Sequence, residues 1–424
     1  MAFQKIKGTL DYIGIDAKKR RYVEQMIRDV MTAYNLQEII TPTFEQTEVF
    51  SRSSGETSDV VTKEMYTFKD KKDRSITLRP EGTAAVVRAF IENKLYALPG
   101  IKKYFYNMPM YRYERPQKGR YREFVQFGVE YFGDASYLLD ADVIGLGDAI
   151  FKKLGLNNYY VSVNTIGDFE SRMNYQNALR TYFKEHIDCL CEDCKNRLEK
   201  NPMRILDCKV DKDSEILKNA PVITDYLTSA SKEYFNNLLN ALDQMGIKYV
   251  VDEKLVRGLD YYTDTVFEYI STGDDTNNPE NLKGLAIGAG GRYTGLTKTL
   301  GGPDVPGIGF AFGVDRVASL LEYYHLLPLL SSDVDLCVLT LDDQSKVYAL
   351  SLITKLRMQG ITCEIDYINN NLKPQFKLSE RLNAKYVGII GEDERQKELI
   401  NIKDTKTGNQ EPVKISELID YLKK

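Results

Sequence analysis

The sequence predicts an α+β fold with a small α/β domain at its C-terminal end. Strand patterns recur in the N-terminal part of the chain, at residues 104–115, 122–132, 255–270 and 284–293. The first two are separated by a short turn, so we expect them to pair as a hairpin. A polar, helix-rich stretch at about 170–245 interrupts the series. Beyond residue 334, strands alternate with helices, which is typical of an α/β domain with mixed or parallel pairing.

The domain organisation follows from these patterns. A chain of 424 residues has the length of two or three domains. We expect a first domain at residues 1–325, with the helical insertion inside it, and a second domain at residues 334–424. The stretch HLLPLLSSD is expected to contain a linker at 326–333.

Two elements are expected near the N-terminus. Residues 16–34 carry apolar side chains at helical spacing, and Asp16 is a plausible N-cap. EIITPTF, residues 38–44, has the pattern of a strand. Pro42 within it favours an edge or an interface, because proline cannot donate to a strand ladder.

The composition is that of an ordinary soluble globular protein, with 43% hydrophobic and 28% charged residues. Because the formal net charge is -4, a polyanionic partner must be met by local basic patches. The start, MAFQKIKGTLDYIG, lacks the apolar core of a signal peptide, and no stretch is apolar enough to span a bilayer. Six cysteines in a chain of this length do not indicate a disulfide framework, so we expect a cytoplasmic protein without a membrane partner.

Positive charge is concentrated in YRYERPQKGRYREFVQFGVE, residues 111–130, where four arginines and one lysine surround one turn. In the strand that follows, Gln126, Gly128 and Glu130 share a face. If the hairpin register brings Arg112 to that face, the sheet presents groups suited to a small polar ligand. Gly128 would leave a gap through which a ligand approaches the backbone. The alternative is an exposed polar face with solvated charges.

TLRPEGTAAVVRA, residues 77–89, is expected to end a strand at Pro80 and to start a helix at Thr83. Glu81 then lies at a sharp corner, where it could meet a substrate ammonium. An equally weighted alternative is a carboxylate at a helix start, where it interacts favourably with the helix dipole.

Three further stretches carry candidate binding residues. LVRGLDYYTDTVFEYI places Arg257, Tyr261 and Tyr262 near the start of a strand. The nearby GAGGRYTG lacks the spacing of a dinucleotide fingerprint and is more typical of a tight turn. In PGIGFAFGVDRVASLL, glycines alternate with bulky residues before a helix that begins near Arg316. This alternation would let a flat group lie against bare backbone with Arg316 above it.

Some kinds of catalytic site are disfavoured. The chain has no G-x-x-x-x-G-K-[ST] phosphate loop and no G-x-S-x-G nucleophile elbow. The two histidines, His186 and His325, lie outside every stretch above, which argues against histidine-based catalysis and a His-rich metal site. Separated arginines are instead typical of a site that neutralises phosphate: Arg112, Arg257, Arg316 and Arg120. Phosphoryl and nucleotidyl chemistry relies on positioning and charge stabilisation, so it needs no side-chain nucleophile.

Four cysteines gather in the helical insertion, at Cys189, Cys191, Cys194 and Cys208. A CxxC pair with further cysteines nearby could hold zinc. However, Cys189-Leu190-Cys191 is tighter than the usual ligand spacing, and only one CxxC is present. We therefore expect reduced thiols and no metal, with zinc as the less favoured alternative.

Together these stretches resemble the class II aminoacyl-tRNA synthetases. TPTFEQTEVF is similar to the tail of motif 1, YRYERPQKGRYREF to motif 2 and GIGFAFGVDRV to motif 3. LVRGLDYYT and AGGRYTGL are similar to the two histidine-specific signatures of the histidyl-tRNA synthetases. The order and spacing fit over nearly the whole chain. Two departures, Asp315 where the family more often has Glu and Tyr113 where His is frequent, touch no expected substrate ligand.

The resemblance implies an antiparallel catalytic sheet flanked by helices, a helical insertion and a C-terminal anticodon-binding domain. It also implies a homodimer formed partly through the motif 1 region. The implied reaction has two steps: L-histidine and Mg-ATP give histidyl-adenylate and pyrophosphate, and the histidyl group then passes to the 3′ end of its tRNA. ATP with Mg²⁺ would be a substrate, and no tightly bound cofactor is expected.

The resemblance also implies roles for single residues. Arg112, Arg257 and Arg316 would be catalytic through the ATP phosphates and adenine, and Arg120 would join them in binding ATP. The histidine-binding set would be Glu81, Thr83, Arg112, Gln126, Glu130, Arg257, Tyr261, Tyr262 and Tyr293. The tRNA acceptor end would meet the loop from Arg115 to Arg120, with Gln117 at its tip.

Three other functions compete with this interpretation. The regulatory subunit of ATP phosphoribosyltransferase resembles the same core and senses histidine, but it typically lacks the C-terminal domain and catalytic motif residues. A synthetase for proline, threonine or glycine is disfavoured because RGLDYYT suits a polar aromatic substrate. A non-catalytic RNA-binding protein would leave Glu81, Gln126 and Glu130 without a purpose.

Overall fold

The computed structural model describes residues 3–55, 58, 60–115, 120–208, 210–211, 214–273, 283–329 and 334–423. It contains two compact units. The larger comprises Met1–Tyr12 and Lys19–Leu327, and the smaller comprises Ile13–Lys18 and Pro328–Lys424. Within the described ranges, no helix is long and apolar enough to cross a membrane. The expected linker at 326–333 lies partly outside them.

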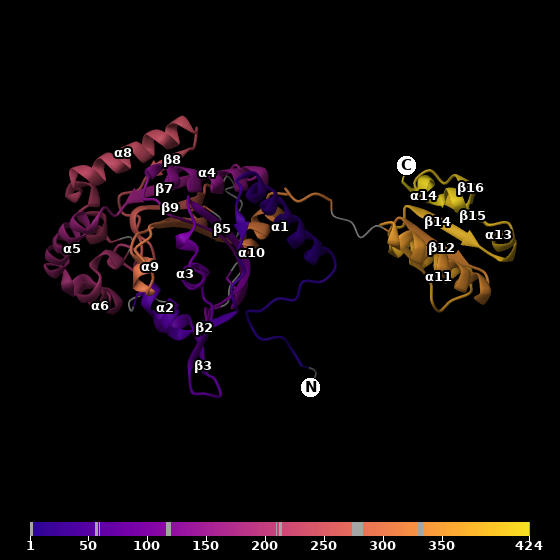
Figure 1. Ribbon diagram of the computed structural model, residues 1–424, viewed down its shortest axis with the longest axis horizontal. Coiled ribbons are helices and arrows are strands. Elements are labelled where there is room, and N and C mark those ends of the chain that lie inside the picture. The colour runs from indigo at the N-terminus through magenta and orange to yellow at the C-terminus, as the bar shows by residue number, and fades with distance from the viewer. Residues whose placement is uncertain are drawn as a thin grey trace. The chain divides into compact units, whose positions relative to one another are not determined.

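The large unit is built on an eight-stranded sheet of order β1-β5-β6-β11-β10-β9-β7-β8 (Figure 1). Its strands are β1 Gln37–Glu38, β5 Lys102–Tyr111, β6 Glu123–Phe132, β7 Tyr159–Thr165, β8 Tyr249–Val251, β9 Thr263–Ser271, β10 Ala286–Tyr293 and β11 Gly307–Gly313. Among these described strands, β1–β5 and β7–β8 are the parallel pairs, and the other neighbours are antiparallel. The antiparallel sheet and the β5–β6 hairpin are therefore confirmed.

One face of this sheet carries the main hydrophobic core. Helices α1 (Ile15–Ala33), α4 (Tyr137–Lys153), α8 (Ser229–Gln244) and α10 (Val314–Tyr323) contribute their apolar stripes. Alternate residues of β6 and β11 point into this core, among them Phe127, Val129, Ile308, Phe310 and Phe312. The bulky residues that alternate with glycines in β11 therefore belong to the core face, which leaves the glycines on the opposite face.

Helix α1 begins one residue earlier than its sequence pattern suggests. It starts at Ile15, so Asp16 lies in the first turn and the N-cap expectation is wrong. The acidic side chain still lies at the helix end where a negative charge is favourable. The expected apolar stripe is present, because Val23, Ile27 and Met31 are fully buried.

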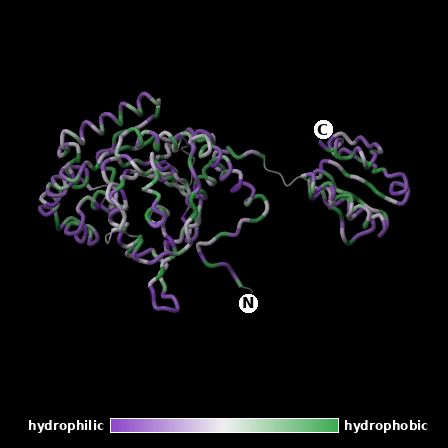
Figure 2. Tube along the Cα trace, viewed as in Figure 1, coloured by the Kyte–Doolittle hydropathy of each residue, from purple (hydrophilic) through white to green (hydrophobic). Residues whose placement is uncertain are grey.

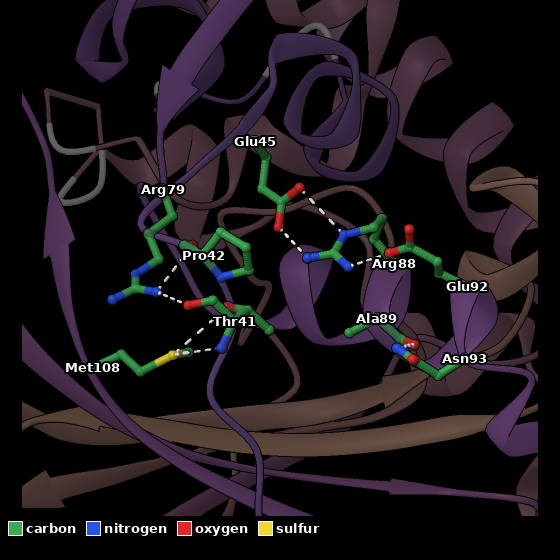
Figure 3. A network of polar contacts seen from close by, with 9 residues as sticks. All are labelled: Thr41, Pro42, Glu45, Arg79, Arg88, Ala89, Glu92, Asn93 and Met108. Atoms are coloured by element: carbon green, nitrogen blue, oxygen red, sulfur yellow. Dashed lines mark hydrogen bonds and ion pairs between the residues drawn. The ribbon is translucent and has the colours of Figure 1, made fainter.

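EIITPTF is divided between two sheets, so the expectation of one strand is wrong. A second sheet has the order β2-β4-β3, with β2 Phe44–Gln46, β3 Tyr66–Lys69 and β4 Ser75–Leu78. Figure 3 shows the reason: Nη1 of Arg79 donates to the carbonyl oxygens of Thr41 at 2.7 Å and Pro42 at 3.0 Å. Because these carbonyls already accept hydrogen bonds from Arg79 and Pro42 has no N–H to donate, the segment does not pair continuously as a strand.

The same network fixes the corner that carries Glu81. Nε of Arg79 donates to the carbonyl of Pro109 on β5 at 2.8 Å. On α3 (Thr83–Glu92), Arg88 pairs with Glu45 of β2 (Figure 3). The chain turn between β4 and α3 is therefore held to both sheets. Away from this corner, the β3–β4 hairpin ends in the hydrophilic tip KDKKDR, purple in Figure 2.

The helical insertion has a small core of its own. It contains α5 Phe169–Lys184, α6 Glu192–Lys200, the 3-10 turn η4 Pro202–Ile205, α7 Glu215–Lys218 and α8. Tyr175, Leu179 and Phe183 of α5 are buried against Leu198 and Ile205. The polar sequence of this stretch therefore conceals enough apolar side chains to fold over the sheet's β7–β9 end.

The smaller unit has a five-stranded sheet of order β13-β12-β14-β15-β16. Its elements are β12 Leu336–Thr340, α11 Asp343–Met358, β13 Cys363–Ile365, α12 Leu372–Arg381, β14 Tyr386–Ile390, α13 Glu392–Gln396, β15 Leu399–Asp404, β16 Gln410–Lys414 and α14 Leu418–Leu422. The pairs β12–β13 and β12–β14 are parallel, whereas β14–β15 and β15–β16 are antiparallel. The expected mixed pairing is confirmed.

Candidate active site

A cavity of about 570 Å³ lies between the large sheet and the helical insertion. The residues flanking the β5–β6 turn, strands β10 and β11, the start of α10 and the segment before β9 all contribute to its wall. The four arginines expected to neutralise phosphate line it together: Arg112, Arg120, Arg257 and Arg316. Folding therefore brings together cations that are widely separated in the sequence.

Small residues form the floor of this cavity. Ala311 on β11 pairs with Ala289 on β10, and Gly313 pairs with Gln126 on β6. Ala289, Ala311 and Gly313 line the cavity together with Gly288. Because their side chains are short, a flat group can lie close to the strand backbones here.

Arg112 follows directly after β5 and is held over the β6 strand. Its Nε donates to the carbonyl of Pro80 at 2.7 Å, and its guanidinium lies 5.3 Å from the ring centre of Phe124. Glu114 lies 3.7 Å from both Arg112 and Arg120. The hairpin pairs Met108 with Gln126, a register that brings Arg112 to the face of Gln126, and both side chains line the cavity.

Arg316 faces these two cations from the first turn of α10. Its Nη1 donates to the carbonyl of Ala286 at 2.7 Å. Burial lowers the pKa of Arg316, and the positive charges of Arg120 and Arg112 lower it further. Cations that repel one another are arranged to hold an anion, whose charge would relieve that repulsion.

Arg257 lies in the segment that precedes β9, so the strand begins later than expected. The guanidinium of Arg257 pairs with Glu268 of β9. Nη1 of Arg204 donates to the backbone carbonyl of Arg257 at 2.8 Å. Burial opposes the positive charge, but the Glu268 carboxylate offsets this, and the pKa of Arg257 is raised overall. Its buried Nε has no hydrogen-bond partner among the residues that the structure describes, which leaves one donor of a fixed cation for a ligand.

A second group of predicted residues forms a buried cluster. The Thr83 hydroxyl donates to Oε1 of Glu130 at 2.6 Å, and the Tyr293 hydroxyl donates to Oε2. Glu130 is 1% exposed. Burial raises its pKa to about 8, even though both hydroxyls favour the charged form, and the nearby Glu81 carboxylate adds to the rise.

Glu81 is occupied at the start of α3. Its carboxylate accepts from the backbone N–H groups of Thr83 at 2.8 Å and Ala84 at 2.9 Å. The helix-start alternative is therefore confirmed as its structural role. Burial raises the pKa of Glu81, and the N–H donors act in the opposite direction.

The expected gap at Gly128 is filled, so that expectation is wrong. Tyr106 lies opposite Gly128 on β5, and a Cβ on Gly128 would be 2.3 Å from its phenolic oxygen. The Tyr106 hydroxyl and the Gly82 N–H both donate to Oε1 of Gln126, at 3.4 and 3.2 Å. Gly128 thus makes room for a tyrosine that orients Gln126, and a ligand cannot approach the backbone there.

Tyr261 and Tyr262 cover this buried cluster. Their rings are 4.7 Å apart, and Tyr261 meets Tyr293 edge-on at 5.7 Å. The predicted residues therefore separate into two sets. The arginines and Gln126 line the cavity, whereas the carboxylates, Thr83 and the three tyrosines are packed beside it.

Side chains cover more of the β11 glycines than the alternating sequence suggests. A Cβ on Gly307 would be 2.2 Å from the Tyr293 ring, and one on Gly309 would be 2.0 Å from Oε2 of Glu130. Gly313 is the open one, because a Cβ there would meet its nearest neighbour, in Arg316, at 3.8 Å. On β11, the surface for a flat group is thus confined to the end of the strand next to α10.

The expected contact with a tRNA end is described only in part. Arg115 is exposed, whereas Gln117 lies outside the described residues. Sequence reasoning also missed Glu268, Arg204 and Tyr106, which hold predicted residues in place. An acidic residue inside the apolar strand pattern TDTVFEYI was the one available signal for Glu268.

A family model described as histidyl-tRNA synthetase matches residues 8–317, which is most of the chain. The chain belongs to the histidyl-tRNA synthetase family. A separate model, described as an anticodon binding domain, matches residues 335–424. The synthetase match spans both sets of predicted site residues.

Individual relatives agree with this membership. The chain is 47% identical over 424 residues to the histidine–tRNA ligase of Bacillus licheniformis, covering 100% of this chain and 99% of that one. The crystal structure of apo S. aureus histidyl-tRNA synthetase is 40% identical, covers 100% of both chains and gives a TM-score of 0.85.

A Bacillus halodurans structure titled as an ATP phosphoribosyltransferase regulatory subunit/histidyl-tRNA synthetase is 20% identical. It covers 92% of this chain and 98% of that one, with a TM-score of 0.63. At this identity the likeness shows the fold alone. The histidyl-tRNA synthetase family therefore rests on the longer and closer matches.

Proposed function

We propose that this chain is a histidine–tRNA ligase whose cavity binds ATP and whose buried carboxylate cluster binds histidine. The observation that carries the proposal is the convergence of Arg112, Arg257 and Arg316 on one cavity beside Glu130. Relatives of the same length bear the name histidine–tRNA ligase. The regulatory-subunit alternative has no specific observation in its favour.

In the first step, a carboxylate oxygen of histidine attacks the α-phosphorus of Mg-ATP. An O–P bond forms, the bond to the bridging oxygen breaks, and pyrophosphate leaves. Arg112 and Arg257 would hold the α-phosphate and stabilise the charge that develops on it, while Arg316 would lie over the adenine. Arg120 would neutralise the departing phosphates. No side-chain nucleophile is needed, because the substrate carboxylate supplies one.

The buried cluster would recognise histidine. Carboxylates suit both its α-ammonium and its imidazole, and Tyr261, Tyr262 and Tyr293 would enclose the ring. Gln126 lines the cavity and accepts from Gly82 at the α3 corner, so it would join the two sets of residues. Because the cluster is packed beside the cavity, histidine would enter only when the Tyr261–Tyr262 pair moves aside.

In the second step, a terminal ribose hydroxyl of the tRNA attacks the histidyl carbonyl, and AMP leaves. The exposed Arg115 and the loop carrying Gln117 would contact the acceptor end. The smaller unit, which matches the anticodon binding domain model, would bind the far end of the tRNA. Since tRNA and ATP are met in the cytoplasm, we propose that location.

We also propose that the chain acts as a homodimer through its motif 1 region. Ile40 and Phe44 in this region are 75% and 55% exposed. Exposed apolar side chains that lie close together in the sequence would fit an association surface.

Amino-acid-dependent ATP–pyrophosphate exchange, with each of the twenty amino acids supplied separately, tests the activity. Exchange with histidine alone is expected. Exchange with another amino acid would keep the ATP site and overturn the histidine assignment. No exchange, together with histidine binding in calorimetry, would favour the regulatory subunit.

A further inference from the structure

A group of metal-ligand side chains lies in the helical insertion, apart from the residues assigned to histidine and ATP. Cys191, Cys194, Cys208 and Asp211 each present one ligand atom, and these atoms lie within 4.8 Å of one another. Cys191 and Cys194 flank the start of α6, and the other two follow η4. Two chain segments therefore meet at these four side chains.

Two of the distances between the ligand atoms match the edges of a tetrahedral zinc site. The Sγ atoms of Cys191 and Cys208 are 3.7 Å apart. Zinc–sulfur bonds of about 2.3 Å at tetrahedral angles place two thiolates about 3.8 Å apart. The Sγ of Cys208 lies 3.6 Å from Oδ2 of Asp211. A zinc–oxygen bond of about 2.1 Å predicts roughly 3.6 Å for that edge as well.

Backbone groups also face this cluster. The N–H of Cys191 donates to Oδ2 of Asp211 at 3.1 Å, and the N–H of Asp211 donates to Sγ of Cys208 at 3.4 Å. Hydrogen bonds of this kind orient metal ligands and stabilise their negative charge. Cys194 is fully buried and Cys208 is 3% exposed, whereas Cys191 is half-buried, so solvent has little access to two of the three thiols.

These four ligands differ from the set of four cysteines that the sequence suggests. In that set, the tight Cys189-Leu190-Cys191 spacing argues against zinc. In the structure, Cys189 is exposed and outside the group, and Asp211 takes the fourth position. The remaining spacing, C-x₂-C followed by a distant cysteine and a carboxylate, has no such conflict.

We propose that Cys191, Cys194, Cys208 and Asp211 bind one structural Zn²⁺ in tetrahedral coordination. Thiolates with one carboxylate suit zinc better than the oxygen-preferring Mg²⁺ or Ca²⁺. Four protein ligands complete the coordination, so the ion would have no open position for a substrate. Its role is to cross-link two segments of the insertion.

The cross-link would brace the wall of the ATP cavity. Cys191 and Cys208 line that cavity. Asp207, next to Cys208, accepts from Nη1 of Arg204 at 3.1 Å, and the same nitrogen donates to the carbonyl of Arg257 at 2.8 Å. A zinc ion that fixes Cys208 therefore fixes the segment that positions Arg257.

Metal content of the full-length chain tests the proposal. The chain is purified without an affinity tag or chelator, under reducing conditions, and zinc is measured by inductively coupled plasma mass spectrometry. Zinc equimolar with the chain is expected. Cys208→Ser and Asp211→Asn should lose most of it, whereas Cys189→Ser, the matched control outside the group, should retain it.

A second measurement avoids variants that fail to fold. The reduced, metal-free wild-type chain is titrated with Co²⁺ and then with Zn²⁺. The visible absorption of tetrahedral, thiolate-bound cobalt should rise to saturation and disappear when zinc displaces it. A chain that neither contains zinc nor develops this absorption would overturn the proposal, as would a native Cys191–Cys208 disulfide found by mass spectrometry.

Discussion

The hydroxyl of Thr83, the first residue of α3, donates to the carboxylate of Glu130 on β6 at 2.6 Å, across 47 residues of sequence. Tyr293, on β10, donates to the other oxygen of the same carboxylate. One buried acidic group thus joins a helix start and two strands. A change in the protonation of Glu130 therefore alters hydrogen bonds to all three elements. This makes Glu130 the clearest source of pH dependence in the proposed histidine site.

Stability should fall as the pH rises between about 5 and about 8, because Glu130 has a pKa of about 8 in the folded chain, against an ordinary value of 4.5. In this window the folded chain keeps a proton that the unfolded chain has released. The contribution is at most about 1.4 kcal/mol per pH unit. Glu130→Gln should flatten this slope in urea unfolding, whereas exposed Glu123→Gln on the same strand should not. Parallel slopes for both variants would contradict the assignment.

Arg257→Ala should nearly abolish adenylate formation. Removing one group that stabilises developing charge costs about 3 kcal/mol, or roughly a hundredfold in rate. ATP–pyrophosphate exchange with saturating histidine measures the loss. Arg180→Ala, which removes an exposed arginine from the insertion, is the control and should keep its activity. Near-normal exchange by Arg257→Ala would remove this residue from the mechanism.

Gly128→Ala should destabilise the fold, because its new Cβ would overlap the Tyr106 ring. Overpacking of this kind costs about 1–3 kcal/mol in the free energy of unfolding. Gly313→Ala, on the neighbouring strand β11, has open space and should cost far less. Equal losses in urea unfolding for the two variants would show that Tyr106 can move away without cost.

Arg292→Ala should lower the free energy of unfolding, because Arg292 has a structural role. Arg292 is 1% exposed and pairs with the fully buried Asp140, and it also donates to the carbonyls of Asp134 and Ser136, each at 3.0 Å. Leaving Asp140 buried without its cation costs about 3–5 kcal/mol. Thermal and urea unfolding measure the loss. Wild-type stability in this variant would refute a structural role.

Ile40→Glu should weaken self-association if the motif 1 region forms the dimer interface. Placing a charge on a surface that becomes buried is unfavourable, so the variant should elute as a smaller species in size-exclusion chromatography with light scattering. Phe169→Glu, at an 81% exposed position on α5, is the matched control and should not change the mass. An unchanged mass for Ile40→Glu would place the interface elsewhere.

Much of the fold was accessible from local patterns. The β5–β6 hairpin, the glycine alternation in β11 and the strand–helix alternation of the smaller unit all follow from periodicity within about ten residues. The prediction of one strand over EIITPTF was wrong for a non-local reason. Arg79, far along the chain, donates to the carbonyls that a strand ladder would need. No pattern within that segment reports a partner outside it.

The kind of chemistry at the candidate site can be inferred from residue types alone. A chain with two histidines and several isolated arginines is suited to nucleotidyl transfer through charge rather than through acid–base catalysis. The packed chain is needed to distinguish the arginines that face the cavity, such as Arg257 and Arg316, from those that stabilise the fold, such as Arg79 and Arg292. Packing also separates Cys189 from the other cysteines of the insertion and brings Asp211 to them. Side-chain type and spacing are properties of a single segment, whereas burial and charge pairing arise between segments that meet only when the chain is packed.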